Sequence, residues 1–378
     1  MNTANTRLLT SLLFLLSSLA AAGCGSTSSS TTPATPVSAT RFYNGTASVG
    51  DFLTIQIDST TLTITYTNHT NGMSGTVPYT VNSNGTYSIT DPSGNLVVAY
   101  EVPGYVMLVE SNKSGPSMNT PALITAIETK PVSVSSFAGQ KFNYLQFRTA
   151  NGGVETGYIS IDAQGAITHD GYSPFQGLQQ GQAAFSGGTF TPSSIVEDPS
   201  GTFFTVDETD GSNDSVFGTQ NGFFTVDTGA GTILGLAQAA TKDFDPTFAG
   251  TYKALYYEKT NAQPGPNNTE PGTVTQGEGS VTIGTTGAFT LTDNQSNSLA
   301  TGTLAAVADT SYLYDSTANT LTDPCNGLFT IRTTTATSRQ DVFVTFQGNA
   351  VIFGSFQTGQ PFVSGTTPYN YFYGVGLK

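Results

Sequence analysis

Charge is scarce in this chain of 378 residues, and basic charge is the scarcest. Only 10% of the residues are charged, against about a quarter in an average soluble protein, and 12 Lys and Arg stand against 26 Asp and Glu. The basic residues are scattered and form no cluster. With a formal net charge of −14 and no basic patch, the chain is not expected to bind nucleic acid or an anionic lipid surface.

Cysteine, histidine and tryptophan are also rare. The chain has two cysteines, two histidines (His69 and His169) and no tryptophan. It contains no G-x-S-x-G or H-E-x-x-H motif, and both histidines stand among residues typical of loops. We therefore expect neither a Ser/His/Asp triad nor a zinc protease site, and a non-enzymatic role is favoured. The lack of tryptophan removes the strongest stacking residue for sugars and cations.

Long apolar runs are absent except near the N-terminus. Residues 8–23 are uncharged and follow a short polar segment that carries one basic residue, Arg7. They are fewer than the roughly 20 residues that a membrane-spanning helix needs. A basic start, a short apolar stretch and small residues before a cut are the parts of a secretory signal. We expect residues 1–23 to be a signal peptide.

The residues before Cys24 indicate how the exported chain is held. Residues 19–24, Leu-Ala-Ala-Ala-Gly-Cys, resemble the lipobox of bacterial lipoproteins, with Ala21 at a place where that family prefers Leu. The resemblance covers the first two dozen residues. It implies that Cys24 is diacylated, that the chain is cut before it, and that the new N-terminus is acylated. It also implies a lipid-anchored protein of the cell envelope, and Gly25 favours the outer over the inner membrane.

A tether and a β-rich body follow. Residues 25–40 consist of small and polar residues without charge or aromatic rings, so residues 24–40 are expected to be the lipidated cysteine and a flexible tether. From Arg41 onward apolar and polar residues alternate, for example in 52–58 and 342–346. Period-two alternation predicts half-buried strands. A helical turn is expected only within 175–185.

Recurring landmarks divide the body into three. Asp-Pro motifs that begin at residues 91, 198 and 323 each precede a strand, and Phe-Ala-Gly occurs at 137–139 and 248–250. We predict an all-β chain of three divergent units, 41–130, 131–242 and 243–378, each with about eight strands. Because a meander has to close or pack to hide its edges, the units should be tandem antiparallel barrels or sandwiches. The alternative is a single β-propeller, in which the aromatic segment 369–373 returns to the first unit.

One acidic stretch is a candidate calcium site. Residues 207–214 supply carboxylate and amide oxygens around Gly211, which is the donor set that Ca²⁺ prefers in flexible loops. The alternative is a solvated hairpin loop without a metal. No other cofactor is indicated. The candidate ligands are Asp207, Asp210, Asn213 and Asp214.

Two further expectations concern burial. Cys325 has no cysteine partner once Cys24 is lipidated, and we expect it to be a buried small side chain. Adjacent aromatic residues such as Tyr256 and Tyr257 point to opposite faces of a strand, so one of each pair should lie outside its unit or in a second interface.

The sequence therefore predicts a membrane-anchored envelope lipoprotein that acts as a binding or structural β module, with a glycan or an envelope protein as partner. Two alternatives stay open. One is a carbohydrate-active enzyme on a propeller, marked by carboxylates that converge on the centre of a ring. The other is a carrier of a small apolar ligand, marked by an unfilled apolar cavity inside a barrel.

Overall fold

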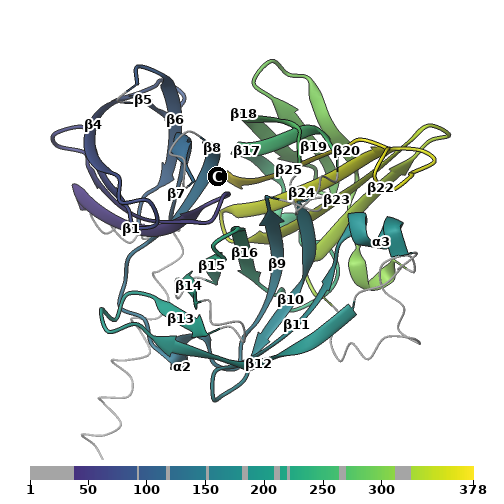
Figure 1. Ribbon diagram of the computed structural model, residues 1–378, viewed down its shortest axis with the longest axis horizontal. Helices are drawn as coiled ribbons and strands as arrows, with labels where there is room; N and C mark the ends of the chain where they lie inside the picture. Colours follow the sequence, from purple (N-terminus) through teal and green to yellow (C-terminus); the bar gives the residue numbers. More distant parts are fainter. Residues whose placement is uncertain are drawn as a thin grey trace, which may run out of the picture. The chain divides into compact units, whose positions relative to one another are not determined.

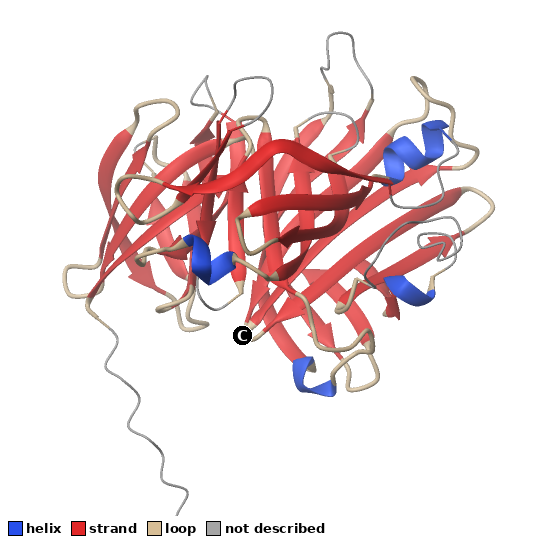
Figure 2. Ribbon diagram, turned by 90° about the horizontal axis from the view of Figure 1, so that it is seen from below, coloured by secondary structure: helices blue, strands red, loops and turns tan. Residues whose placement is uncertain are grey.

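The computed structural model describes residues 38–91, 93–115, 120–149, 153–180, 186–207, 213–218, 222–263, 270–310 and 325–378. The predicted all-β fold of three barrel-like units is confirmed, because the strands form three antiparallel sheets and the described helices are short (Figure 2). Residues 38–378 form one compact unit. In the described part of the chain, no helix has both the length and the hydropathy needed to span a membrane.

The first sheet is a closed barrel of eight strands in up-and-down order (purple to blue in Figure 1). β1 pairs with β2 on one side and with β8 on the other, which leaves no free edge. On β2, buried residues alternate with half-buried ones, as the period-two pattern predicts. The strands are β1 Thr40–Ala47, β2 Asp51–Asp58, β3 Thr63–Asn68, β4 Ser74–Val81, β5 Tyr87–Thr90, β6 Leu96–Val102, β7 Val106–Ser114 and β8 Thr120–Glu128.

The second sheet is also a closed barrel of eight strands, in which β9 pairs with both β10 and β16. Helix α3, Pro174–Gln180, confirms the helical turn that was expected in this region. His169 lies within β11, so its expected place in a loop is wrong. The strands are β9 Lys141–Arg148, β10 Val154–Ile161, β11 Ala166–Tyr172, β12 Ser186–Glu197, β13 Phe204–Asp207, β14 Asn213–Gly218, β15 Phe223–Asp227 and β16 Gly231–Ala237.

The third sheet has nine strands in the order β20-β19-β18-β17-β25-β24-β23-β22-β21. Its middle is the pairing of the first strand, β17, with the last, β25. A 3-10 helix, η3 Val307–Asp309, follows β21. The strands are β17 Gly250–Ala262, β18 Thr273–Ile283, β19 Ala288–Asp293, β20 Ser298–Thr303, β21 Ala305–Ala306, β22 Leu328–Thr334, β23 Ser338–Gln347, β24 Ala350–Gly359 and β25 Tyr369–Leu377.

The propeller alternative is wrong. A propeller needs separate four-stranded blades, whereas here the first strand of each sheet pairs with its last strand. The aromatic segment 369–373 lies in β25 and pairs with β17 and β24, so it belongs to the third sheet and does not return to the first. The sheets occupy 40–128, 141–237 and 250–377, and each expected unit boundary falls between two of them.

The Phe-Ala-Gly landmarks have a structural role that the sequence did not reveal. Phe137 ends a short helix, α2 Val134–Phe137, directly before β9, and Phe248 ends the 3-10 helix η1 Pro246–Phe248 directly before β17. Phe137 belongs to the core inside the second barrel, and Phe248 packs against the core of the third sheet. Each motif therefore lies where the chain enters a new sheet, and its phenylalanine ring packs in the interior of that sheet.

Besides these interiors, a fourth apolar cluster joins residues of all three sheets. It explains the aromatic pairs. Tyr256 belongs to the interior cluster of the third sheet, whereas its neighbour Tyr257 belongs to the shared cluster. Phe224 and Phe223 divide in the same way between the second barrel and the shared cluster. The expected second interface is thus present, and both members of each pair are buried.

Candidate functional site

The interior of the first barrel holds an apolar cavity of about 90 Å³. Inward-facing residues alternate along each strand, and most of them here are Ile, Leu or Val, which are shorter than the aromatic rings found elsewhere in the chain. An eight-stranded barrel is just wide enough for side chains to fill it, so shorter side chains leave space at its axis. The apolar lining consists of Leu53, Ile55, Ile64, Met73, Val77, Ile89, Val97, Val109 and Ile124.

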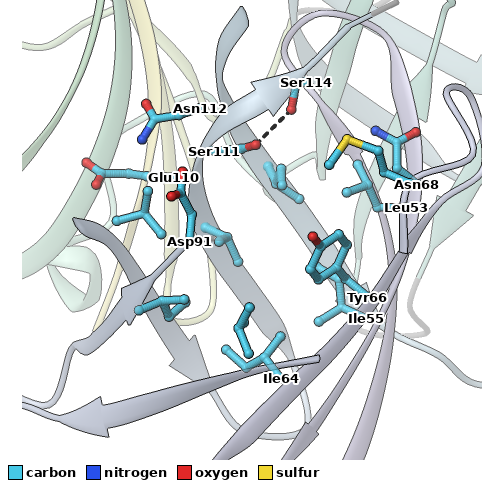
Figure 3. Close-up of a pocket in the computed structure, with 16 residues that line it drawn as sticks. Leu53, Ile55, Ile64, Tyr66, Asn68, Asp91, Glu110, Ser111, Asn112 and Ser114 are labelled. Atoms are coloured by element: carbon cyan, nitrogen blue, oxygen red, sulfur yellow. Dashed lines mark hydrogen bonds between the residues drawn. The ribbon is translucent and has the colours of Figure 1, made fainter. Parts of the chain in front are cut away.

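Polar residues gather toward one end of this cavity. Strand order places Asn68, Asp91 and Ser114 at the same end, because the β3–β4, β5–β6 and β7–β8 turns of an up-and-down barrel all lie there. Figure 3 shows Ser111 and Ser114, which share a hydrogen bond of 3.0 Å between their hydroxyl groups, on the opposite side of the pocket from Ile64. The site is therefore an apolar cup with a polar rim.

The opposite end of the barrel is closed by a buried carboxylate. Arg41 forms a two-pronged hydrogen bond with Glu101, at 2.6 Å to Oε1 and 2.8 Å to Oε2, and the Glu101 side chain is fully buried. Tyr43 donates to the same Oε1, and Tyr87 donates to Oε2 at 2.9 Å. A charge-assisted bidentate pair with further donors satisfies a buried carboxylate. We call these four residues the basal plug.

The tyrosines of the basal plug are held in their neutral form. Burial and the neighbouring Glu101 carboxylate raise the pKa of Tyr43 and Tyr87 well above the usual range. The hydrogen bond with Glu101 likewise raises the pKa of Arg41. The Arg41 guanidinium and the two tyrosine hydroxyl groups of the plug therefore keep their charge states throughout the physiological pH range. We assign the plug to closure and stability of the barrel, since none of its four residues lines the cavity.

The other two sheets differ in how their interiors are filled. The second barrel contains an apolar cavity of about 60 Å³, which Phe137 and Phe224 help to line. The interior of the third sheet is packed with aromatic rings, among them Phe329, Phe346 and Phe353. The cavity of the first barrel is thus larger than that of the second.

Three of the calcium candidates, Asp207, Asn213 and Asp214, lie where β13 ends and β14 begins. Asp207 ends β13 and is the cross-strand partner of Asn213, which begins β14. The side chain of Asp214 lines the cavity of the second barrel. Asp210 lies outside the described residues. Among the described residues, no three His, Cys, Asp or Glu side chains gather where they could hold a metal ion. The calcium site stays a prediction.

Other residues singled out in the sequence lie away from the first cavity. Cys24 lies outside the described residues. Cys325 is 1% exposed, as expected of a small buried side chain. The Nε2 of His69 lies 3.1 Å from the hydroxyl oxygen of Thr54, and the imidazole ring packs on Phe52 with the ring centroids 4.5 Å apart. The described structure therefore brings neither histidine-based catalysis nor a reactive thiol to the cavity.

Sequence reasoning missed the basal plug, although a signal was present. Arg41 and Tyr43 share the inward phase of β1, and Glu101 shares the inward phase of β6 with Val97 and Ala99. A charged residue in the buried phase of a strand needs a partner. Reading the alternation for charges of opposite sign would have suggested the Arg41–Glu101 pair.

Comparisons with known proteins give no family. No family model matches the chain, and no curated protein matches it significantly. Among solved structures, the chain is similar to a double mutant of transferrin binding protein B from Haemophilus parasuis Hp5, with 9% identity, a TM-score of 0.21, and coverage of 91% of this chain and 77% of that chain.

Two further solved structures show similarity at the same level. Transferrin binding protein B from serogroup B Neisseria meningitidis has 9% identity and a TM-score of 0.19, with 87% of this chain and 66% of that chain covered. A protein of unknown function from Nostoc punctiforme has 7% identity and a TM-score of 0.21, with 66% and 100% covered. Likeness at TM-scores near 0.2 carries no functional argument, so the site has to be interpreted from its own geometry.

Proposed function

We propose that this chain is an exported envelope lipoprotein, anchored through Cys24, whose first barrel binds a small apolar ligand. The observation that carries the binding proposal is the apolar cavity of about 90 Å³ inside a closed barrel with a polar rim. Ligand pockets are typically concave and apolar with a few polar groups that orient the ligand. This geometry favours the carrier among the alternatives that the sequence left open.

Energetics support a bound occupant. An apolar cavity costs stability in proportion to its volume, and at about 24 cal/mol per Å³ an empty space of this size costs about 2 kcal/mol. A ligand that fills the space recovers that loss and also buries its own apolar surface, at about 0.8 kcal/mol per CH₂ group. The cavity is smaller than an engineered one of about 150 Å³ that binds benzene, so the best fit is a slender group such as an alkyl chain.

Equilibrium binding of 1-hexanol, measured by isothermal titration calorimetry, tests the carrier. We expect binding to the wild-type protein and loss of binding in Ile89→Phe, because the added ring occupies the cavity that Ile89 lines. Val363→Phe is the matched control, since Val363 is exposed in the third unit and its substitution should leave binding unchanged. Absence of hexanol binding, or equal binding to wild type and Ile89→Phe, would contradict the proposal.

The anchor needs a separate test. The lipobox resemblance and the uncharged segment 25–40 support attachment through Cys24. The protein should fractionate with membranes, the outer membrane in particular, and Cys24→Ala should move it to the soluble fraction. Undiminished membrane association of Cys24→Ala would overturn the lipid anchor and leave the ligand proposal untouched.

A further inference from the structure

The wall of the first barrel is not complete between β6 and β7. The β6–β7 ladder runs from Val102–Val106 to Ala99–Val109 and stops there. Toward the polar end, β6 continues to Leu96 but pairs only with β5, and β7 continues to Ser114 but pairs only with β8. The two strands therefore part beyond Ala99 and Val109. We call this parting the lateral slit.

Side chains satisfy the backbone donors that the parting releases. The amide of Val98 donates to Glu110 Oε2 at 3.0 Å, where an unbroken ladder would offer a carbonyl oxygen. The amide of Ser111 donates to Gln276 Oε1 at 3.3 Å, and the amide group of Gln276 donates to Asn112 Oδ1 at 2.9 Å. Since buried backbone donors are almost always paired, these contacts stabilise the parted state. The slit is thus a built feature of the wall.

The slit adjoins the cavity. Val97 and Val109, which flank it, line the cavity together with Glu110 and Ser111. Figure 3 shows Glu110 on the side of the pocket opposite Tyr66, with its carboxylate directed away from the lumen. The Glu110 side chain therefore lies in the wall and leaves the lumen to the apolar residues.

The end of the barrel next to the slit is spanned by turns. Asn71 in the β3–β4 turn donates to the Gly115 carbonyl oxygen at 3.2 Å. The buried Asp51 carboxylate accepts from Gly115 N at 2.8 Å and from Asn68 Nδ2 at 2.7 Å. These bonds join the β3–β4 and β7–β8 sides of the end.

We propose that the lateral slit is the entrance to the cavity and that the hydrogen bond from Val98 N to Glu110 latches it. The proposal rests on the proposed function, since it assigns the route by which a small apolar molecule reaches that site. Leu96, 68% exposed at the outer edge of the slit, offers an apolar surface to an arriving molecule. The latch is a positioning contact, and it does not touch the bound ligand.

The surroundings of Glu110 suit a latch that opens. Burial, reinforced by the nearby Glu278 carboxylate of β18, raises the pKa of Glu110 to about 7, while the hydrogen bond from Val98 opposes the rise. Tyr256 of β17 also lies within electrostatic range. The carboxylate is therefore balanced between its two protonation states near neutral pH, and the latch is weaker when the group is protonated.

A cysteine inside the lumen measures access without requiring ligand affinity. In a chain with Cys24→Ala and Cys325→Ala, Ile124→Cys places a thiol in the cavity, and its rate of reaction with methyl methanethiosulfonate reports how fast a small apolar molecule enters. Adding Glu110→Ala should accelerate labelling by about tenfold, the change expected when a hydrogen bond to a charged acceptor is lost. Glu110→Gln keeps an acceptor oxygen for Val98 N but loses the charge, so its rate should lie between those of wild type and Glu110→Ala.

Two controls separate the slit from general loosening. Ile167→Cys, in the cavity of the second barrel, should label at the same rate with and without Glu110→Ala. Ser111→Trp, which places a ring where the slit meets the cavity, should slow labelling of Ile124→Cys. Thr70→Trp, at an exposed position of the β3–β4 turn outside the cavity lining, should not. An unchanged rate in Glu110→Ala, or slowing by Thr70→Trp alone, would overturn the entrance. Failure of hexanol binding would instead refute the carrier, because labelling does not depend on affinity.

Discussion

The first barrel and the third sheet show two ways of filling the same kind of interior. Both arise from antiparallel meanders, and both place alternate residues inside. In the first barrel the inward residues near the middle are Ile, Leu and Val, and a cavity of about 90 Å³ remains. In the third sheet the rings of Phe329 and Phe346 pack on each other in the interior, and the ring of Phe353 packs on Phe372.

The difference shows that closure and filling are separate properties. The first barrel is closed by strand pairing around its circumference, apart from the lateral slit, and its interior is not filled. The third sheet keeps two edge strands, β20 and β21, and its interior is filled. In a sheet that keeps edge strands, apolar packing between the facing walls supplies stability. In a barrel whose strands pair all the way round, the strand pairing holds the wall together even when the interior is not filled. We therefore expect the third sheet to carry stability and the first barrel to carry binding.

The largest effect on stability should come from removing an aromatic ring from the interior of the third sheet. Phe346→Ala removes a fully buried ring that contacts Phe244, Phe248 and Phe329, and should lower the free energy of unfolding by about 3 to 5 kcal/mol. Ile55→Val in the first barrel should cost only about 1 kcal/mol. Urea unfolding measures both changes. Equal costs at the two sites would break the comparison.

The next largest effect concerns the basal plug. Arg41→Met leaves the buried Glu101 carboxylate without its cation and should cost about 3 kcal/mol in urea unfolding. Replacing both partners, as in Arg41→Met with Glu101→Leu, should recover most of the loss because no uncompensated charge remains. If the double variant is no more stable than Arg41→Met, the loss of unfolding free energy does not come from the unpaired Glu101 carboxylate.

Filling the cavity should have a smaller and opposite effect. Val97→Ile adds one CH₂ group to the lining of the first cavity and should raise the free energy of unfolding by about 1 kcal/mol while weakening hexanol binding. The same addition in the third sheet, Val344→Ile, has no space to enter and should destabilise. Stabilisation by Val344→Ile would show that the third interior is also unfilled.

The last effect is the pH dependence of the latch. The folded-state pKa of Glu110, about 7, lies above its ordinary value of 4.5, so the folded state binds the proton more tightly. The corresponding stability is fully present below about pH 4.5 and is lost as the pH rises through 7. Glu110→Gln should therefore be more stable than wild type at pH 8, and the difference should largely disappear at pH 4.5. A constant difference across this range would contradict a titrating Glu110.

The sequence by itself determined the strands. Alternation in stretches such as 52–58 and 342–346 predicted half-buried strands because a pleated strand turns successive side chains to opposite faces. Turn residues between them predicted meanders, and scarce basic charge argued against nucleic acid as a partner. The resemblance to a lipobox at Cys24 is equally local, since it depends only on neighbouring residues. All of these are properties of short range along the chain.

Only the tertiary structure decided which strands close a sheet, what fills it and where it opens. Arg41 and Glu101 are 60 residues apart, and Gln276 and Asn112 are 164 residues apart, so no local pattern connects either pair. The cavity depends on the summed volume of side chains from many strands, and the slit depends on where one ladder stops. These properties depend on three-dimensional packing, which brings residues distant in sequence into contact. A period-two pattern shows which face a side chain takes and carries no information about which distant residue it meets.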